Sequence, residues 1–485
     1  MISQQKFYIT TPIYYVNDKP HIGHAYTTIA ADVIARYYRL LEYSVFFLTG
    51  TDEHGAKVVQ SAKTRGKSPK IYASEIAKEF INIWKKLNIS NDFFIRTTDS
   101  RHEEKVKEVL QKIYSKGYIY EGVYKGSYCI GCEKYLTKDE IVNNHCLLHP
   151  NQKIIYQKEK NYFFKLSRFE NQLLSIYLNS QNKNHLAILP KDKAKEIVGK
   201  LKEGLNDIPI SREHIDWGIK LPWDSSQSCY VWVDALFNYW TATRFIKHKN
   251  EFWPPNLQLI GKDILWFHAV IWPALLLAAD LSLPKKIFAH GFFTINGKKM
   301  SKSVGNTITP QKLIRVFGVD ATRYLLLSGF SFGSDGDVSI SAFNLNYNAQ
   351  LANGLGNLTS RIIKLINDID FKPPYSILEG NISSLMKDDR FKFYHRSMTN
   401  LEFDKTIKFI QEKIREIDKV LDKEKPWRLK KTNSTLFKKV LNELLLSLFE
   451  ISLLIEPFMP QTSHKIKNAL LEPKRLSGTK LFPRI

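Results

Sequence analysis

The order of apolar and polar segments near the N-terminus constrains the fold more than any other feature of this sequence. Lys6 to Pro12 is a short β-prone run, and it leads through a loop at Tyr14-Tyr15 into a helix expected to start near His24. Val45 to Leu48 is a second apolar run, and a glycine-containing loop follows it at 49–55. Strand, loop, helix, strand and loop in this order begin a parallel α/β sheet. Ligands bind such sheets at the carboxyl ends of the strands, which is where both loops lie.

The rest of the sequence predicts an interruption of this sheet and then a second, helical part. Between about Tyr118 and Trp223 a cysteine cluster and tyrosine- and lysine-rich strands indicate an insertion between two halves of the sheet. The α/β pattern resumes at Cys229 to Asp234 and at Leu257 to Ile260.

Past about Ala342 the strand signals vanish. One apolar stripe marks a long amphipathic helix and comprises Phe403, Ile407, Ile410, Ile414, Ile417 and Leu421. Val440 to Ile455 indicates a mostly buried helix that Pro457 stops. The last 140 or so residues are therefore expected to form a separate helical bundle.

The tetrapeptide His21-Ile22-Gly23-His24 lies directly after the first strand, at the expected start of the first helix. Gly23 lets the backbone approach a ligand closely, and the free N–H groups of a helix N-terminus bind phosphates. His21 and His24 can donate to phosphate oxygens, most strongly when a transition state adds charge there. Two histidines near a turn are more often surface or capping groups, but the position after the first strand favours a phosphate site.

The pentapeptide Lys299-Met300-Ser301-Lys302-Ser303 lies in a loop with a glycine close by on either side. Lys299 and Lys302 supply the positive charge that a pyrophosphate leaving group needs, and Ser301 and Ser303 add hydroxyl donors. The plainer interpretation is an exposed basic loop in a lysine-rich chain. Together the two motifs resemble the HIGH and KMSKS signatures of class I aminoacyl-tRNA synthetases.

Four side chains that bind metals form two close pairs, in the pattern Cys129-x2-Cys132-x13-Cys146-x2-His149. This spacing suits a tetrahedral zinc ion, and four protein ligands leave no open position, so the predicted role is structural. His145 is a competing ligand, but it is adjacent to Cys146 and therefore sterically poorer. Free thiols in a small β-region are the alternative.

A set of mostly aromatic residues is expected on loops or strand ends near the two motifs. The set comprises Ile13, Tyr15, Trp232, Tyr239, Phe267 and His268. Taken alone, each is more often part of a core than of a ligand site. A pocket of Trp, Tyr and Phe rings would suit a flexible thioether through sulfur–aromatic contacts. Asp52 lies on a loop at a strand end, where its carboxylate can pair with a substrate ammonium group.

Over nearly its whole length the chain resembles the methionyl-tRNA synthetase family, in the bacterial form with a single zinc knuckle. The resemblance rests on Thr10 to Asn17, Pro20 to Tyr26, Phe46 to Gly55, Ala289 to Phe292 and Gly297 to Asn306. It implies an α/β fold, with a Rossmann-like parallel-sheet catalytic domain, an inserted zinc-knuckle connective domain and then an all-α helical-bundle anticodon-binding domain. The expected parts are the first catalytic half 1–117, the connective insertion 118–225, the second catalytic half 226–295, the KMSKS loop and stem-contact region 296–345 and the anticodon-binding domain 346–485.

The same resemblance implies roles for the matching residues. The residues implied for ATP are His21, Gly23, His24, Lys299, Ser301 and Lys302, with both histidines and both lysines as catalytic residues. The implied methionine pocket is Ile13, Tyr15, Asp52, Trp232, Leu236, Tyr239, Phe267 and His268, in which Asp52 holds the α-amino group. At the position of Leu236 some relatives have proline. The implied zinc ligands are Cys129, Cys132, Cys146 and His149.

Asn353, Asn357 and Arg361 recur at steps of four, which places them on one helix face, and Trp427 follows Lys425-Pro426. These four residues resemble the family's readers of the CAU anticodon, and the Trp427 ring would stack on an unpaired base. The alternative is that the asparagines cap or bridge helices and that Trp427 belongs to the core.

The implied reaction has two steps. The methionine carboxylate attacks the α-phosphate of ATP, giving methionyl-adenylate and pyrophosphate. The 3′-terminal ribose hydroxyl of tRNA(Met), initiator tRNA included, then attacks the adenylate carbonyl. Mg2+ is expected with ATP, and one structural Zn2+ per chain.

Charge and composition bear on partners and location. With 71 basic and 48 acidic residues the net charge is +23, which favours a polyanionic partner, although low-GC codon usage explains the lysine excess equally well. No secretory signal or membrane span is read, so a cytoplasmic protein without a membrane partner is expected. The chain ends at Ile485 with no appended dimerisation domain, which favours a monomer.

Two other functions stay open at this point. A different class I synthetase, such as the cysteine, leucine, isoleucine or valine enzyme, would carry the same two motifs. The insertion of about a hundred residues is short for a hydrolytic editing domain, and the aromatic set favours a thioether. The second alternative is a tRNA-binding relative without catalysis, against which the two intact motifs argue.

Overall fold

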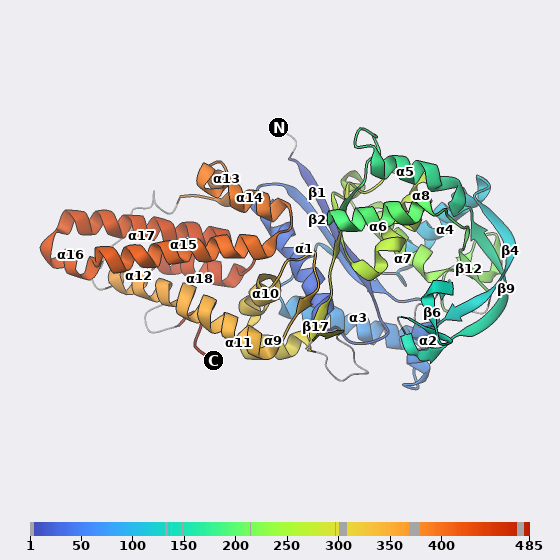
Figure 1. The fold of residues 1–485 in the computed structure, drawn as a ribbon, viewed down its shortest axis with the longest axis horizontal. Helices are drawn as coiled ribbons and strands as arrows, with labels where there is room; N and C mark the ends of the chain where they lie inside the picture. Colours follow the sequence, from blue (N-terminus) through green and yellow to red (C-terminus); the bar gives the residue numbers. More distant parts are fainter. Residues whose placement is uncertain are drawn as a thin grey trace.

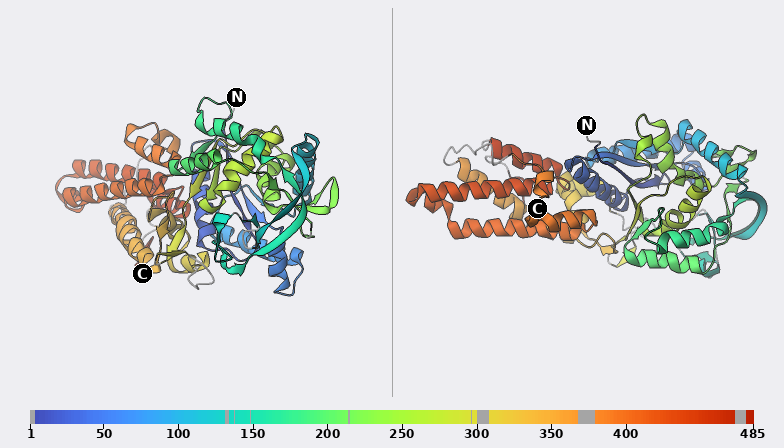
Figure 2. Two further views of the ribbon diagram at one scale, coloured as in Figure 1. Left: turned by 45° about the vertical axis from the view of Figure 1, so that its right-hand side comes forward. Right: turned by 90° about the horizontal axis from the view of Figure 1, so that it is seen from above.

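The structure is a computed structural model that describes residues 4–130, 134–136, 138–147, 149–213, 215–295, 297–299, 308–367, 379–472 and 480–485. The molecule is elongated, with an α/β part at one end and a bundle of long helices at the other (Figure 1). Figure 2 shows the bundle projecting from the α/β part in two further views. The α/β class and the helical C-terminal part predicted from the sequence are confirmed. In the part of the chain that the structure describes, no helix combines the length and apolar character needed to cross a membrane.

Six parallel strands form the central sheet, in the order β10-β16-β15-β1-β2-β3. Their bounds are β1 Lys6–Tyr15, β2 Ser44–Asp52, β3 Phe93–Arg96, β10 Ala187–Leu189, β15 Leu257–Gly261 and β16 Lys286–His290. The chain leaves β1 toward β2 on one side, and β15 pairs with β1 on the other. The carboxyl ends of β1 and β15 therefore flank a topological switch point, where α/β sheets bind ligands.

Helices cover both faces of this sheet because alternate strand residues point to opposite sides. Phe7 and Ile9 belong to one core with α1 (Ile22–Leu40) and α3 (Pro69–Lys86). Tyr8 belongs to the other core, formed with α4 Ser100–Ser115, α5 Glu170–Leu178, α6 Lys191–Lys202, α7 Val231–Phe245 and α8 Trp272–Ala278. The shorter α2 (Ala56–Lys63) follows β2.

Two local predictions are wrong. The first strand continues through Tyr14 and Tyr15 instead of ending in a loop there. Its register against β2 shifts between Thr10 and Ile13, and this irregularity accommodates Pro12, which has no N–H to donate. Four residues of the aromatic set lie in helices rather than on loops or strand ends: Trp232 and Tyr239 in α7, and Phe267 and His268 in the π-helical segment Phe267–Ile271. At Trp232 the buried setting of α7 overrides the β-propensity of the first residues of the helix.

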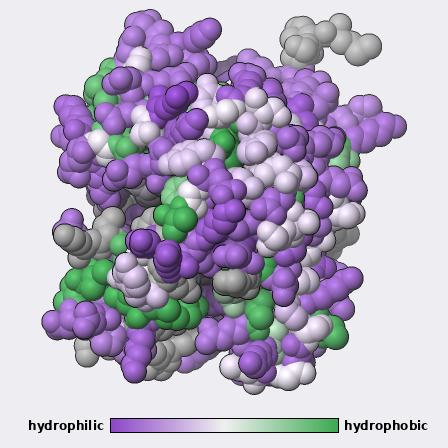
Figure 3. Space-filling model, turned by 90° about the vertical axis from the view of Figure 1, so that its right-hand side faces the viewer, coloured by the Kyte–Doolittle hydropathy of each residue, from purple (hydrophilic) through white to green (hydrophobic). Residues whose placement is uncertain are grey.

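The predicted insertion is built on a long antiparallel ribbon. Strands β4 (Ile119–Cys129) and β9 (Ile155–Phe164) pair along their length. The insertion also contains short strands: β5 Lys134–Tyr135, β6 Ile141–Val142, β7 His145–Cys146, β8 His149–Lys153, β11 Ile208–Pro209, β12 Ser211–Arg212, β13 Lys220–Leu221 and β14 Asp224–Cys229. Strand β10 falls within the range 118–225 yet pairs with β16 of the central sheet. Figure 3 views the ribbon's end of the molecule, where hydrophilic residues cover most of the surface.

The C-terminal part is helical, as predicted. Its helices are α11 Ile340–Asn346, the π-helical η6 Tyr347–Gly356, α12 Asn357–Asn367, α13 Ile382–Leu385, α14 Lys392–Thr399, α15 Phe403–Glu424, α16 Pro426–Thr432, α17 Ser434–Ile455 and α18 Pro460–Leu471. All six stripe residues of α15 are buried, and α17 ends two residues before Pro457. The apolar stripe therefore predicted α15, and the buried segment 440–455 predicted α17 except for its first six residues.

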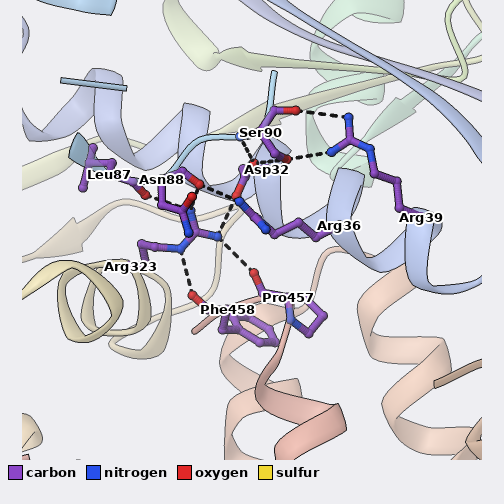
Figure 4. A network of polar contacts seen from close by, with 9 residues as sticks. All are labelled: Asp32, Arg36, Arg39, Leu87, Asn88, Ser90, Arg323, Pro457 and Phe458. Atoms are coloured by element: carbon purple, nitrogen blue, oxygen red, sulfur yellow. Dashed lines mark hydrogen bonds and ion pairs between the residues drawn. The ribbon is translucent and has the colours of Figure 1, made fainter. Parts of the chain in front are cut away.

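A buried arginine joins the bundle to the α/β part (Figure 4). Arg323, on α10 (Val319–Ser328), forms a 2.7 Å ion pair with Asp32 of α1, and both side chains are fully buried. The same guanidinium donates to the carbonyls of Pro457 and Phe458, between α17 and α18, at 3.0 and 2.9 Å. Asp32 also accepts from the backbone N–H of Ser90 at 2.6 Å. One ion pair thus fixes the first helix against the turn between two bundle helices.

Candidate active site

A cavity of about 400 Å3 opens at the carboxyl ends of β1 and β15. Its walls come from the end of β1, the start of α1, the end of β2, the first half of α7 and the segments that follow β15 and β16. The sequence-predicted residues among its lining are Ile13, Tyr15, His21, Gly23, His24, Asp52, Trp232, Leu236, Tyr239 and His268. The topology therefore brings together residues that lie more than two hundred positions apart in the sequence.

Some predicted residues stand elsewhere. Phe267 does not line the cavity; its ring lies behind that of Trp232, with centroids 3.8 Å apart and planes 9° apart. Lys299 belongs to the short strand β18 (Lys298–Lys299), and its side chain is outside the described part of the structure. Ser301 and Lys302 lie outside the described residues altogether.

The two histidines of the first motif cap α1 reciprocally. The helix starts at Ile22, two residues before the predicted start at His24. His21 Nδ1 accepts from the N–H of Gly23 at 3.1 Å, and His24 Nδ1 accepts from the N–H of His21 at 3.3 Å. Their rings stack with centroids 3.8 Å apart. Capping, which the sequence left as the plainer interpretation, thus holds both rings at the rim of the cavity.

The apolar side of the cavity contains a hydrogen-bonded pair without charge. Burial lowers the pKa of His268 to about 4, so its ring is neutral at physiological pH. Its Nδ1 donates to the carbonyl of Ile264 at 3.0 Å, which leaves Nε2 to accept from the hydroxyl of Tyr239 at 2.7 Å. Burial holds the pKa of Tyr239 above its usual value. Both rings therefore present a fixed, uncharged polar edge in an otherwise apolar wall.

Asp52 supplies a carboxylate to the lining of the same cavity. It ends β2, pairs in register with Tyr15 and is half-buried. Asp52 lines the same cavity as Tyr239 and His268, and its charge adds to the effect of burial in raising the pKa of Tyr239. An amino acid whose ammonium group is bound at Asp52 would have its side chain directed toward uncharged rings.

The sequence did not assign some lining residues to the site. Among them are Thr27, Asp263, His290 and Phe292. His290 Nε2 lies 2.6 Å from Thr27 Oγ1, and burial lowers the pKa of His290 to about 4. Their place in the sequence could have indicated them, because Asp263 and His290 lie at the ends of two parallel strands that meet at the same sheet edge.

The hairpin that leads into the basic motif is anchored near the cavity. Strand β17 (Phe293–Ile295) pairs with β18 and with β19 (Gly336–Asp337). Asp337 accepts from Thr294 Oγ1 at 2.7 Å and from the N–H of Gly297 at 2.9 Å. These two bonds fix the turn before the pentapeptide.

A second cluster, in the insertion, has the chemistry of a metal site. The ligand atoms of Cys129, Cys146 and His149 lie within 4.8 Å of one another. His149 Nδ1 is 3.8 Å from Cys129 Sγ and 4.0 Å from Cys146 Sγ, close to the edges of a tetrahedron around zinc. Both thiols are buried with Leu136 in a very small apolar core. The fourth predicted ligand, Cys132, lies outside the described residues.

The polar residues predicted to read an anticodon lie on the bundle surface. Arg361 forms ion pairs across to α15, with Asp418 at 2.5 Å and Asp422 at 2.6 Å. Asn353 accepts from Arg484 Nε at 2.8 Å and lies in the π-helical η6, so its spacing to α12 is not that of one α-helix. Trp427, at the start of α16, is 44% exposed, which excludes the core alternative for its ring.

Sequence comparison places these features in a known context. A profile of the family described as tRNA synthetases class I (M) matches residues 7–150 and 131–363. The methionine–tRNA ligase of Thermotoga maritima is 41% identical over 472 residues, which cover 95% of this chain and 74% of the relative. That of Rickettsia felis is 41% identical over 475 residues, covering 96% of this chain and 92% of the relative.

Solved structures agree. Methionyl-tRNA synthetase from Mycobacterium tuberculosis in complex with methionyl-adenylate superposes with a TM-score of 0.88 at 35% identity, covering 99% of this chain and 98% of the other. The ligand-free form of the Mycobacterium tuberculosis enzyme gives a TM-score of 0.81 at 31% identity, with the same coverage. The likeness extends over both the α/β part and the bundle.

Proposed function

The chain belongs to the methionyl-tRNA synthetase family of class I aminoacyl-tRNA synthetases, and from this premise we propose how its residues carry out the family's reaction. It is a methionine–tRNA ligase. It activates L-methionine with ATP to methionyl-adenylate and pyrophosphate, and then transfers methionine to the 3′-terminal ribose of tRNA(Met). The alternatives of another class I synthetase and of a non-catalytic relative are set aside by these matches.

One observation carries the residue assignment. A single cavity at the sheet's switch point is lined by a carboxylate, an uncharged aromatic wall and the two stacked histidines. We assign the methionine ammonium group to Asp52 and the thioether to the wall of Ile13, Tyr15, Leu236, Tyr239 and His268. Trp232 closes this pocket, and Phe267 supports it by stacking. A neutral wall suits the thioether because sulfur makes favourable contacts with rings but accepts hydrogen bonds only weakly.

We assign ATP to the rim formed by His21, Gly23 and His24. Because both Nδ1 atoms accept backbone hydrogen bonds, the Nε2 atoms of the two histidines are the ones that can donate to phosphate oxygens. Lys299, Ser301 and Lys302 are proposed to meet the pyrophosphate from the anchored hairpin. Catalysis then consists of positioning the methionine carboxylate in line with the α-phosphate and of stabilising the charge that develops there.

Two metal ions are proposed in different roles. Cys129, Cys132, Cys146 and His149 would hold one zinc ion, which would supply folding energy to a knuckle whose apolar core is too small to fold alone. Mg2+ is proposed to enter with ATP.

The bundle is proposed to bind the anticodon of tRNA(Met), including the initiator tRNA. Trp427 offers an exposed ring for stacking, and Asn353, Asn357 and Arg361 offer polar groups along the neighbouring helices. Arg361 is held by Asp418 and Asp422 in the free protein, so we propose that binding a base exchanges one of these ion pairs for the base edge. A monomeric state and a cytoplasmic location complete the proposal.

The test is isotopic ATP–pyrophosphate exchange, run with each amino acid in turn. Exchange that depends on methionine, and that Asp52→Asn weakens by raising the methionine KM, supports the assignment. Exchange with methionine that is unchanged in Asp52→Asn would remove Asp52 from the site without touching the family assignment.

A further inference from the structure

A buried cluster of polar side chains lies behind the cavity. Asp234, in the first turn of α7, is 1% exposed and carries a hydrogen bond on each carboxylate oxygen. His54 Nδ1 lies 2.7 Å from its Oδ2, and His102 Nε2 lies 2.7 Å from its Oδ1. His102 Nδ1 lies 2.7 Å from Thr241 Oγ1. None of these four side chains is among the described residues that line the cavity.

The cluster connects the two walls of the methionine pocket. His54 follows Asp52 by two residues in the loop after β2, and Asp234 follows Trp232 by two residues on α7. The same helix carries Leu236 and Tyr239. One buried carboxylate therefore ties the proposed ammonium ligand to the aromatic wall, and His102 adds the support of α4.

Charge strengthens this connection. Burial alone would lower the pKa of His54, but the charge and hydrogen bond of Asp234, with smaller contributions from Glu103 and Asp52, raise it to about 10. His54 is therefore an imidazolium at neutral pH, with Glu103 Oε1 3.6 Å from its Nε2. Buried ion pairs rarely stabilise a fold by themselves, because desolvation offsets most of the attraction. Holding the two parts of the pocket in place accounts better for a buried His54–Asp234 ion pair at this position.

We propose that Asp234 is a positioning residue for methionine: through His54 it sets the place of Asp52 relative to Trp232 and Tyr239. The amino group and the thioether of one substrate are then bound together at a fixed spacing. This inference rests on the proposed function, in which Asp52 holds the ammonium group.

Two substitutions at Asp234 separate geometry from charge. In Asp234→Asn the amide oxygen still accepts from His54 Nδ1. The amide nitrogen donates to His102 Nε2 once His102 moves its proton to Nδ1 and donates to Thr241. Both bonds survive, but the negative charge is lost. Asp234→Ala removes bonds and charge together.

Methionine and ATP KM values from pyrophosphate exchange are the readout. Asp234→Ala is expected to raise the methionine KM about 10- to 100-fold while leaving the ATP KM within about threefold. Asp234→Asn is expected to match the parent protein at about pH 8. As the pH falls toward about 6, its methionine KM should rise, because His54 then gains a proton that Asp234 no longer balances beside the substrate ammonium. The other charged groups that face His54 are Glu103 and Asp52, and they remain in place.

A double-mutant cycle with Asp52→Asn, and a matched control, complete the test. If Asp234 acts through Asp52, the two effects on the methionine KM do not add. Asp320→Ala removes a carboxylate of similar burial that accepts from the N–H of Thr462 far from the cavity, and it should lower Tm without moving the methionine KM.

The outcomes distinguish the two levels of the proposal. An Asp52→Asn variant with an unchanged methionine KM would defeat the ammonium assignment itself. If Asp52→Asn raises the methionine KM while Asp234→Ala lowers only Tm, or if the two effects add, the positioning role is overturned. Should Asp234→Ala fail to fold, His54→Ala breaks the same hydrogen bond from the other side, and a methionine KM that does not rise in this variant overturns the proposal.

Discussion

The protonation states of single residues give the cavity its selectivity in this account. His268 and His290 are both held neutral by burial, whereas His54 is held charged by Asp234. These three histidines around one cavity thus differ in charge because their surroundings differ. A neutral ring beside the proposed thioether site, and a His54 charge that Asp234 balances behind Asp52, suit an amino acid with an apolar side chain.

The neutral histidines predict a pH dependence of stability. Their pKa values fall from an ordinary 6.5 to about 4, so the unfolded chain binds more protons between these values. Stability is therefore expected to decline as the pH falls from about 6.5 to 4, by at most about 3 kcal/mol for each histidine. Urea denaturation at pH 7 and pH 5 measures this. Equal free energies of unfolding at both values would contradict the assignment of buried neutral rings.

The Tyr239 hydroxyl is expected to matter for methionine rather than for ATP. Tyr239→Phe leaves His268 Nε2 buried without its donor, so the ring loses its fixed orientation in the pocket wall. We expect the methionine KM in pyrophosphate exchange to rise about three- to tenfold with the ATP KM unchanged.

Tyr394→Phe is the matched control for this change. It removes an equally buried hydroxyl, which donates to the carbonyl of Leu454 at 2.8 Å in the bundle. It should lower Tm alone, and parallel rises in both KM values for Tyr239→Phe would point to general loosening instead.

At the scale of elements, the sequence predicted what depends on pattern and missed what depends on the tertiary setting. The stripe from Phe403 to Leu421 defined α15 because its 3.6-residue period leaves no other structure that buries it. Trp232 was misplaced because a buried helix start looks like a strand when β-branched and aromatic residues fill it. The cluster around Asp234 was invisible for a different reason: no local pattern connects positions 54, 102 and 234.

The proposed zinc knuckle is the element that we expect to depend most on a ligand for its stability. Its apolar core consists of Cys129, Leu136 and Cys146, with Ile141 and Ile154 packed against it. We expect freshly purified protein to contain one zinc per chain, and chelation to unfold the knuckle while the central sheet persists. Elemental analysis, with near-ultraviolet circular dichroism before and after chelation, measures both. Protein that contains no zinc yet keeps an ordered knuckle would contradict the site.

At the scale of the whole molecule, one buried ion pair joins the two parts that we propose bind different ends of the tRNA. Burial would raise the pKa of Asp32, but Arg323 and Arg36, with the hydrogen bond from Ser90, hold it below its usual value. Asp32 therefore keeps its charge, and with it the ion pair to Arg323, at physiological pH.

The loss of stability on removing either arginine that pairs with Asp32 should increase with the burial of that arginine. Arg323→Met leaves the Asp32 charge buried without its fully buried partner and is expected to lower the free energy of unfolding by about 3–5 kcal/mol. Arg36 also pairs with the Asp32 carboxylate, but its side chain is 20% exposed. Arg36→Met should therefore lower the free energy of unfolding by about 1 kcal/mol or less. Guanidinium denaturation measures both, and equal costs would show that Arg323 is not the joint.

The anticodon assignment predicts that the two half-reactions can be separated. Trp427→Ala removes an exposed ring, so the free protein loses little packing. We expect tRNA charging to fall about 10- to 100-fold, as loss of one stacked base does, while pyrophosphate exchange is unchanged. Equal losses in both assays would indicate damage to the fold instead.

The other site assignments depend on the proposal that methionine is activated in the cavity between β1 and β15. A crystal structure of this chain with a stable methionyl-adenylate analogue tests it most directly. We expect the analogue's ammonium group within hydrogen-bonding distance of Asp52, its thioether against Tyr239 and Leu236, and its phosphate beside His21 and His24. An analogue bound with its amino group away from Asp52, or outside this cavity, would show that methionine is not activated in this way.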